Sequence, residues 1–253
     1  SVGQYLRVND LNMYYEVHGT GRPLLLIHGG SVSSQMWQPH LAAFAAHYQV
    51  VTPDSRGHGK TDNPSGKLSY RQMSDDIAAL IQRLNLDSPM VFGYSDGGQI
   101  ALELGMRYQH LAGALVVGAA LHTFSDAYFQ RVAEMGLTGP GVVDFDHLGR
   151  NSPDWIEFMQ TVHVRDEYPK YWQNLLVQIS ELWWTPLGYE PADFQAFVDP
   201  TLILMGDRDG LVDLVQAFEL YKMIPDAELA ILPNATHFSA INEQSLGIIL
   251  DFF

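Results

Sequence analysis

Short apolar runs alternate with longer stretches of helical periodicity along most of this sequence. The runs are continuously apolar or β-branched, as in parallel strands that are covered on both faces, and they lie at residues 24–27, 49–52, 90–92, 114–117, 201–205 and 228–232. Apolar residues at helical spacing occur in the intervening stretches, at residues 37–46, 70–84, 99–108, 214–223 and 243–253. This order of strands and helices predicts an α/β fold with a mostly parallel, doubly wound sheet.

One long region breaks the alternation. Residues 122–199 contain no convincing buried strand and hold four of the five tryptophans. We therefore expect a single core, formed by residues 1–121 and 200–253, that is interrupted by a helical cap insertion at residues 122–199. Such an aromatic insertion between two strands of a sheet is typical of a lid. Each tryptophan either lines a site beneath the lid or only packs the lid onto the core.

The amino-terminal region carries a different pattern. Residues 4–8 and 11–17 alternate polar and apolar side chains, which predicts an exposed antiparallel hairpin. The first residues show no basic stretch followed by an apolar run, so we expect no signal peptide and a cytoplasmic protein. No apolar run approaches the roughly 20 residues that span a bilayer, so we expect no membrane partner.

Composition and charge exclude several classes of function. Apolar residues make up 47% of the 253 residues, which favours a globular enzyme over a disordered chain. The 14 basic and 29 acidic side chains give a net charge of −15, a surface that repels nucleic acid. Cysteine is absent, which removes disulfides and thiolate chemistry. The histidines lack metal-ligand spacing, so we expect neither a metal nor an organic cofactor. The oligomeric state stays open.

The segment Gly93-Tyr94-Ser95-Asp96-Gly97 directly follows an apolar run and opens a helical stretch. This is the Gly-x-Ser-x-Gly pattern of a nucleophile elbow in its strand–turn–helix setting. The turn holds the serine in a strained conformation, and side chains at the glycines would collide with the neighbouring strand and helix. We predict that Ser95 is a nucleophile. The positive end of the helix that follows it faces the oxyanion that forms during attack.

A second pattern, His28-Gly29-Gly30, ends the first buried run. An oxyanion hole needs two backbone N–H groups, one from the residue after the nucleophile and one from the loop after this earlier strand. We expect the amides of Asp96 and Gly30 to supply them, because a residue without a side chain lets the backbone approach the substrate. His28 could act as a ligand or base, but we expect it to orient the loop through hydrogen bonds.

The acid and the base of a serine triad follow the nucleophile in the order Asp or Glu, then His. Asp207 and Asp209 both lie in the loop after the run at residues 201–205. We favour Asp209, which lies deeper in the loop and can reach a histidine, while Asp207 is expected to bond loop amides. His237 is the only histidine downstream of this pair, so it is the predicted base.

These motifs resemble the α/β-hydrolase fold superfamily, in its branch of serine-nucleophile esterases and lipases, over nearly the whole chain. Residues 54–61, which read DSRGHGKT, are similar to a D-x-R-G-x-G-x-S/T segment that follows the fourth strand in that family. The resemblance implies that the acid lies three residues after the glycine of a G-x-x-D segment, which fits Gly206 and Asp209. Arg56 is expected to brace the loops rather than to take part in chemistry.

The predicted mechanism is two-step acyl transfer through Ser95, His237 and Asp209. We expect a carboxylesterase-like serine hydrolase that cleaves a small, largely apolar ester. The same triad could serve a lactonase, a C–C bond hydrolase, an amidase or a cofactor-free perhydrolase, and some family members are small-ligand sensors. A serine nucleophile argues against haloalkane dehalogenases and epoxide hydrolases, which carry aspartate there.

The net charge of the insertion predicts the sign of the charge on the substrate. Residues 122–199 hold 12 acidic and four basic side chains, and Asp96 adds a carboxylate beside the nucleophile. A field of this sign slows the encounter with anions. We therefore expect a neutral or cationic substrate rather than a polyanionic one.

Overall fold

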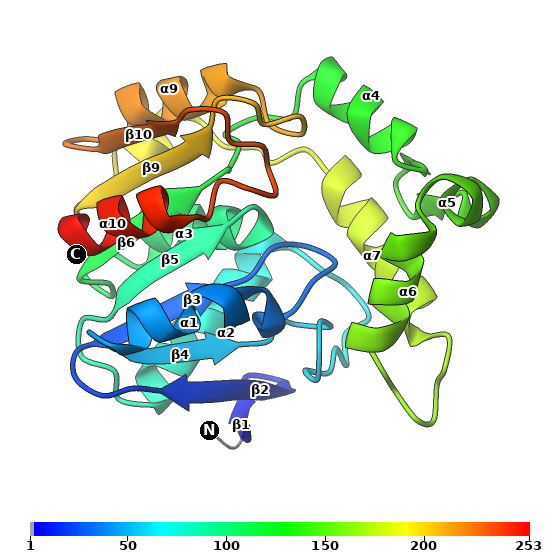
Figure 1. Cartoon of the computed structure of the whole chain (residues 1–253), viewed down its shortest axis with the longest axis horizontal. Helices are drawn as coiled ribbons and strands as arrows, with labels where there is room; N and C mark the ends of the chain where they lie inside the picture. The colour runs from blue at the N-terminus through cyan, green and yellow to red at the C-terminus, as the bar shows by residue number, and fades with distance from the viewer. Residues whose placement is uncertain (1–2) are drawn as a thin grey trace.

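The computed structural model describes residues 3–253, and its centre is an eight-stranded sheet (Figure 1). The strand order is β1-β2-β4-β3-β5-β6-β9-β10. The strands are β1 Gln4–Val8, β2 Leu11–His18, β3 Pro23–Ile27, β4 Gln49–Pro53, β5 Met90–Tyr94, β6 Ala114–Gly118, β9 Thr201–Gly206 and β10 Glu228–Leu232. The six strands from β4 to β10 in this order are parallel. The prediction of a mostly parallel, doubly wound sheet is confirmed.

The amino-terminal hairpin is antiparallel, as predicted, but it is not an exposed appendage. Strand β2 pairs with β4 as well as with β1, and so it joins the main sheet. Its residues Leu11 and Met13 are completely buried. The alternation of polar and apolar residues in β2 therefore indicates a strand with one face on the core. The expectation that the hairpin is exposed was wrong for β2.

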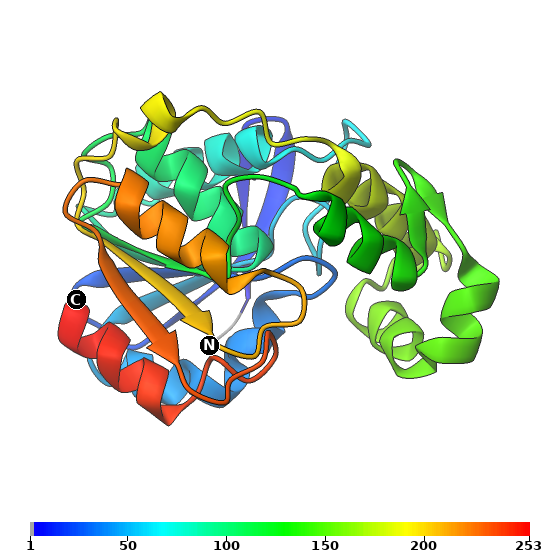
Figure 2. The same ribbon diagram turned by 90° about the horizontal axis from the view of Figure 1, so that it is seen from above.

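Helices cover both faces of the sheet (Figure 2). Alternate residues of a strand point to opposite faces, so Leu24 and Leu26 of β3 pack towards one layer and Leu25 and Ile27 towards the other. The first layer holds α1 Gln38–Ala45 and α10 Glu243–Phe252; the second holds α2 Tyr70–Arg83, α3 Asp96–Arg107 and α9 Leu214–Met223. A short 3₁₀ helix, η1 Ser34–Trp37, precedes α1. The helical stretch that the sequence predicted from residue 37 therefore begins at the last residue of η1.

Residues 122–199, which lie between β6 and β9, contribute no strand to the eight-stranded sheet. It contains α4 Asp126–Glu134, β7 Leu137–Gly139, β8 Val142–Val143, α5 Phe145–Asn151, α6 Pro153–Val162, α7 Tyr171–Trp184 and α8 Pro191–Phe194. Figures 1 and 2 show α4 to α7 to one side of the sheet, past its carboxyl ends. We refer to residues 122–199 as the insertion.

Two details of the insertion differ from a simple helical lid. Strands β7 and β8 form a small antiparallel ladder that the sequence did not reveal, because runs of three and two residues carry no period-two pattern. Helix α8 contacts α3 and α9 of the main body. The end of the insertion therefore lies against the core.

Within residues 3–253, no helix is both long and apolar enough to cross a membrane. The cytoplasmic location stays a prediction.

Candidate active site

Ser95 lies at a sharp turn between β5 and α3. Its backbone has φ 57° and ψ −118°, a strained conformation for a residue with a side chain. A Cβ atom on Gly93 would overlap the carbonyl of Gly97, and one on Gly97 would overlap the carbonyl of Ile27. The glycines of the motif are therefore required by backbone packing, and they allow the turn that projects Ser95 from the sheet.

The structure brings Ser95, His237 and Asp209 into one chain of hydrogen bonds. Nε2 of His237 lies 3.0 Å from Oγ of Ser95, and Nδ1 lies 2.7 Å from Oδ2 of Asp209. When Nδ1 carries the proton and donates to the carboxylate, Nε2 can accept the serine proton. The Tyr94 hydroxyl donates to the carbonyl oxygen of His237 at 2.8 Å and so fixes the histidine loop.

The loop after β9 distinguishes the two candidate acids. Oδ1 of Asp209 accepts hydrogen bonds from the amides of Leu211 and Val212, at 2.9 and 2.8 Å, while Oδ2 faces His237. The amide bonds that we expected of Asp207 are formed by Asp209, and within residues 3–253 the Asp207 side chain bonds no loop amide. The Asp207 side chain is one-third exposed and lies 3.9 Å from the Arg208 guanidinium.

The two amides expected to form an oxyanion hole belong to Gly30 and Asp96. Asp96 is the first residue of α3, where helical amides have no partner within the helix. Among residues 3–253, no protein acceptor bonds the Gly30 amide. A Cβ atom on Gly30 would overlap the Asp96 carboxylate and press against the Trp183 ring. Glycine at this position therefore keeps space for the carboxylate and the ring.

Ser31, the next residue in this loop, is held at three points. Its amide donates to Nε2 of His58 at 3.3 Å, and its carbonyl accepts from Nε2 of His163 at 3.0 Å. The Trp155 indole N–H donates to its hydroxyl at 3.1 Å. The backbone of Ser31 has φ 60°, an uncommon value for serine. Two residues of the insertion thus fix the strained residue that follows Gly30.

His28, His58 and His163 form a buried cluster beneath this loop, with neighbouring ring centroids 5.3 and 5.7 Å apart. Burial lowers the pKa of His28 to about 4 and the pKa values of His58 and His163 to about 3. Each ring faces one carbonyl and accepts from one amide, so each is neutral. His28 bonds Gly29 and the Ser55 amide, which is the orienting arrangement that we expected.

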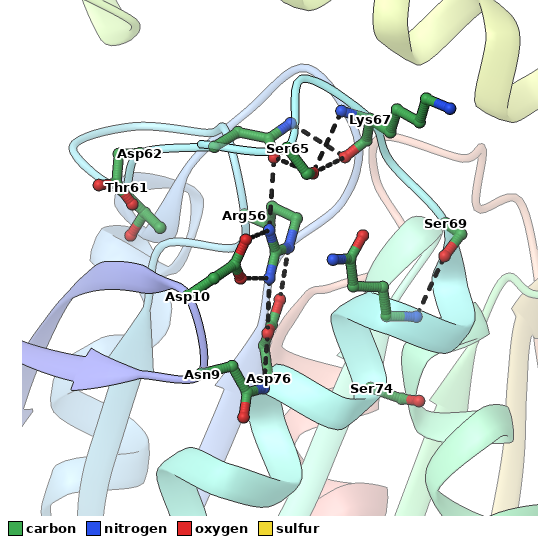
Figure 3. A network of polar contacts seen from close by, with 12 residues as sticks. Asn9, Asp10, Arg56, Thr61, Asp62, Ser65, Lys67, Ser69, Ser74 and Asp76 are labelled. Carbon is green, nitrogen blue, oxygen red and sulfur yellow. Dashed lines mark hydrogen bonds and ion pairs between the residues drawn. The ribbon is translucent and has the colours of Figure 1, made fainter.

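Arg56 anchors the neighbouring loop (Figure 3). Its buried guanidinium donates to both carboxylate oxygens of Asp76, at 2.8 and 2.9 Å, and to Asp10 at 2.6 Å. A further bond of 3.4 Å reaches Asn63. These bonds join α2, the β1–β2 turn and the loop after β4. They agree with a bracing role for Arg56.

A cavity of about 400 Å³ opens beside Ser95 and His237. Its wall is mostly apolar and includes Leu121, Val132, Met135, Trp155 and Trp183. A smaller hollow of about 230 Å³ meets it and shares Ser95 and His237. The candidate nucleophile therefore lies where two hollows join. A substrate that is cleaved there has space for one part on each side.

The four tryptophans of the insertion divide into two pairs. Trp155 and Trp183 line the larger cavity and donate indole N–H groups to Ser31 and Asp96. Trp172 is buried, and Trp184 stacks on Phe129. Both interpretations of the aromatic insertion therefore hold, each for two residues.

The Asp96 side chain has a special environment. It is nearly buried, and it accepts hydrogen bonds from the Tyr70 hydroxyl at 2.8 Å and from the Trp183 indole at 3.0 Å. Burial raises the pKa of Asp96, and these hydrogen bonds oppose the rise. Among residues 3–253, no group of three or more acidic or histidine side chains is arranged to hold a metal ion.

A model of the alpha/beta hydrolase family matches residues 24–246. The chain belongs to the α/β hydrolase family. A relative named "Putative carbamate hydrolase RutD", from Azorhizobium caulinodans, is 28% identical over 96% of this chain and 97% of its own length. The 2-hydroxy-6-oxo-2,4-heptadienoate hydrolase of Pseudomonas putida is 26% identical over 91% of this chain and 87% of its own. The crystal structure of the enol-lactonase from Burkholderia xenovorans LB400 shares the fold, with a TM-score of 0.73, 21% identity and coverage of 98% and 99%.

The chain is thus a hydrolase of the α/β fold, as its sequence motifs predicted. The names of these three proteins refer to a carbamate, a dienoate and an enol-lactone. Membership of the family therefore does not by itself identify the bond that is cleaved, which depends on the geometry of the site.

Proposed function

We propose that this protein is a carboxylesterase-like serine hydrolase that cleaves small, largely apolar esters through Ser95, His237 and Asp209. The observation that carries the proposal is the pair of contacts at 2.7 and 3.0 Å that joins the three side chains at the edge of an apolar cavity. The core at residues 1–121 and 200–253 supplies the triad, and the insertion covers it as a cap.

The geometry supports the following order of proton transfers. His237 accepts the hydroxyl proton of Ser95 as Oγ attacks the ester carbonyl, and Asp209 stabilises the resulting imidazolium. The amides of Gly30 and Asp96 hold the oxyanion. His237 then protonates the departing alkoxide, so that an acyl-serine and an alcohol result. A water molecule then loses a proton to His237 and attacks the acyl group. His237 returns this proton to Oγ of Ser95 as the acid leaves, which restores both residues.

The cavity favours an ester of modest size. A volume of about 400 Å³ is at the lower end for small-molecule sites, and an apolar wall with few polar groups suits a short acyl chain. Arg131 lies on this wall, but its guanidinium already donates to Asp213 at 2.6 Å and to the carbonyl of Leu211. The guanidinium is therefore engaged, which disfavours a substrate carboxylate there.

A comparison of substrate classes tests the proposal. Purified protein is assayed with p-nitrophenyl acyl esters, lactones, amides and vinylogous diketones, together with the Ser95→Ala variant. We expect sustained turnover of short acyl esters by the parent and none by the variant, since loss of the nucleophile costs roughly 10⁶ in turnover. A single burst followed by arrest would indicate a ligand sensor. Preferential turnover of another class would reassign the bond.

A further inference from the structure

The Asp96 carboxylate is an unneutralised charge on the cavity wall beside the nucleophile. Its donors are the Tyr70 hydroxyl and the Trp183 indole, and both groups are neutral. No cationic side chain among residues 3–253 bonds it. Buried carboxylates are ordinarily paired with a cation. The site is therefore one positive charge short.

Burial raises the pKa of Asp96, and the hydrogen bonds from Tyr70 and Trp183 oppose this rise because they favour the ionised carboxylate. An indole N–H can only donate, and burial raises the pKa of Tyr70 well above its usual value, so that this hydroxyl also stays protonated. A carboxylate offers about four acceptor positions, and two donor groups leave part of that capacity unused. The unused acceptor positions can bond a ligand, because Asp96 lines the cavity.

The position of this charge has a cost for catalysis on neutral substrates. The Asp96 amide is one of the two proposed donors to the oxyanion, and its carboxylate packs against Gly30, which supplies the other. A fixed negative charge so close to the hole repels the developing oxyanion. A positive charge on the substrate would offset this repulsion and complete the ion pair.

We propose that Asp96 binds a protonated primary amine on the acyl part of the substrate, which makes α-amino acyl esters the preferred class. The inference rests on the proposed esterase function. The leaving oxygen must face Nε2 of His237 to be protonated, so the acyl group lies on the side of Gly30 and Asp96. Tyr128 also lines the cavity, and a tyrosine hydroxyl oxygen can accept a second ammonium proton.

A matched pair of esters tests the inference. Valine ethyl ester carries an α-ammonium group, and ethyl 2,3-dimethylbutanoate carries a methyl group in its place. Both are assayed at a pH where the amine is protonated, with the parent, Asp96→Asn and Asp126→Asn. Asp126 is exposed on α4, so the Asp126→Asn substitution removes the same charge at a position outside the cavity. The two esters differ in intrinsic reactivity, but this difference cancels when the ratio of their kcat/KM values is compared between the parent and a variant.

We expect the ratio of kcat/KM for the amino ester over the neutral ester to fall about 100-fold in Asp96→Asn. Turnover of the neutral ester should rise about tenfold in this variant, because the repulsion on the oxyanion is relieved. In Asp126→Asn the ratio should stay within about threefold of the parent. A ratio that stays within this range in Asp96→Asn as well would overturn the inference and leave the esterase proposal intact. Failure of the parent on every ester would instead overturn the proposed function.

Inhibition of the parent gives a second measurement that does not depend on the stability of the variant. Isobutylammonium and isobutanol are compared as competitive inhibitors of hydrolysis of the neutral ester. We expect the ammonium compound to inhibit at least about tenfold more strongly, because it pairs with Asp96 in a site of low polarity. Equal inhibition by the two compounds would contradict the assignment of an ammonium site.

Discussion

Nε2 of His163 donates a hydrogen bond to the carbonyl oxygen of Ser31 across 3.0 Å, although 132 residues separate the two in the chain. His163 belongs to the insertion, and Ser31 follows Gly30 in the loop proposed to hold the oxyanion. The same imidazole accepts the Gly59 amide at 2.9 Å. The insertion therefore fixes the backbone of this loop as well as covering the cavity.

This relationship predicts a positioning role for His163. Replacement by leucine removes both hydrogen bonds, including one of the three that hold the strained Ser31, so the Gly30 amide is less firmly oriented. We expect kcat for esters to fall about 10- to 100-fold, since loss of an oxyanion donor costs about 10²–10³, while KM changes little. The measurement is steady-state kinetics on the parent and the variant. His147→Leu, at a half-buried histidine of α5 that does not line the cavity, is the control. Equal losses of kcat in the two variants would contradict the role.

The buried histidines predict a loss of stability in acid. Burial holds the pKa values of His28, His58 and His163 at about 4, 3 and 3 in the folded protein, whereas an unfolded histidine titrates near 6.5. The unfolded state thus binds more protons between about pH 6.5 and 3, so stability falls as the pH falls through this window. The slope is at most about 1.4 kcal/mol per pH unit for each histidine.

Urea unfolding at several pH values between 7 and 5 measures this slope. The informative variant is His163→Asn, because the amide offers an uncharged donor and acceptor in place of the imidazole. We expect the slope to decrease by about one quarter to one third, since His163 is one of three histidines whose pKa burial lowers to about 3 or 4, and burial lowers the pKa of His40 as well. An unchanged slope in this variant would mean that the acid sensitivity arises elsewhere in the chain.

The candidate acids should separate by their effect on turnover. Asp209→Asn keeps the size of the side chain but removes the charge that orients and stabilises the His237 imidazolium, so kcat should fall about 10⁴-fold. Asp207→Asn changes a partly exposed side chain beside Arg208, and any effect should be on stability. Kinetics and thermal unfolding of both variants make the comparison. A larger loss of kcat in Asp207→Asn than in Asp209→Asn would show that Asp207 is the acid of the triad.

Local patterns predicted the fold well because its strands and helices have strong periodicity. The buried run of β5 and the glycines around Ser95 belong to one continuous stretch, so strand, turn and helix could be read together. The ladder of β7 and β8 lacks such a pattern, because its strands have three and two residues. Burial of β2 depends on its pairing with β4, which lies 31 residues or more further along the chain.

The surroundings of the site could not be predicted in the same way. His163 and Ser31 have no shared motif or spacing, and only the packing of the insertion on the core joins them. The same holds for the Trp183 indole on Asp96, where the two residues are 87 positions apart. Sequence motifs locate residues that a single turn or loop must hold. Contacts between distant segments depend on the tertiary packing of the whole chain.

Arg56 provides the last prediction, a separation of stability from activity. Its guanidinium is fully buried and forms two bonds to Asp76 and one short bond to Asp10. Lysine keeps the charge but cannot form the two parallel bonds to Asp76, so one carboxylate becomes poorly paired. We expect Arg56→Lys to lower the free energy of unfolding by about 3 kcal/mol. The control is Arg107→Lys at the partly exposed pair with Asp75, where we expect the free energy of unfolding to fall by less than about 1 kcal/mol.

Because Arg56 does not line the cavity, kcat of the folded fraction of Arg56→Lys should change by less than threefold. A large fall in kcat with unchanged stability would show that Arg56 acts on the reaction itself.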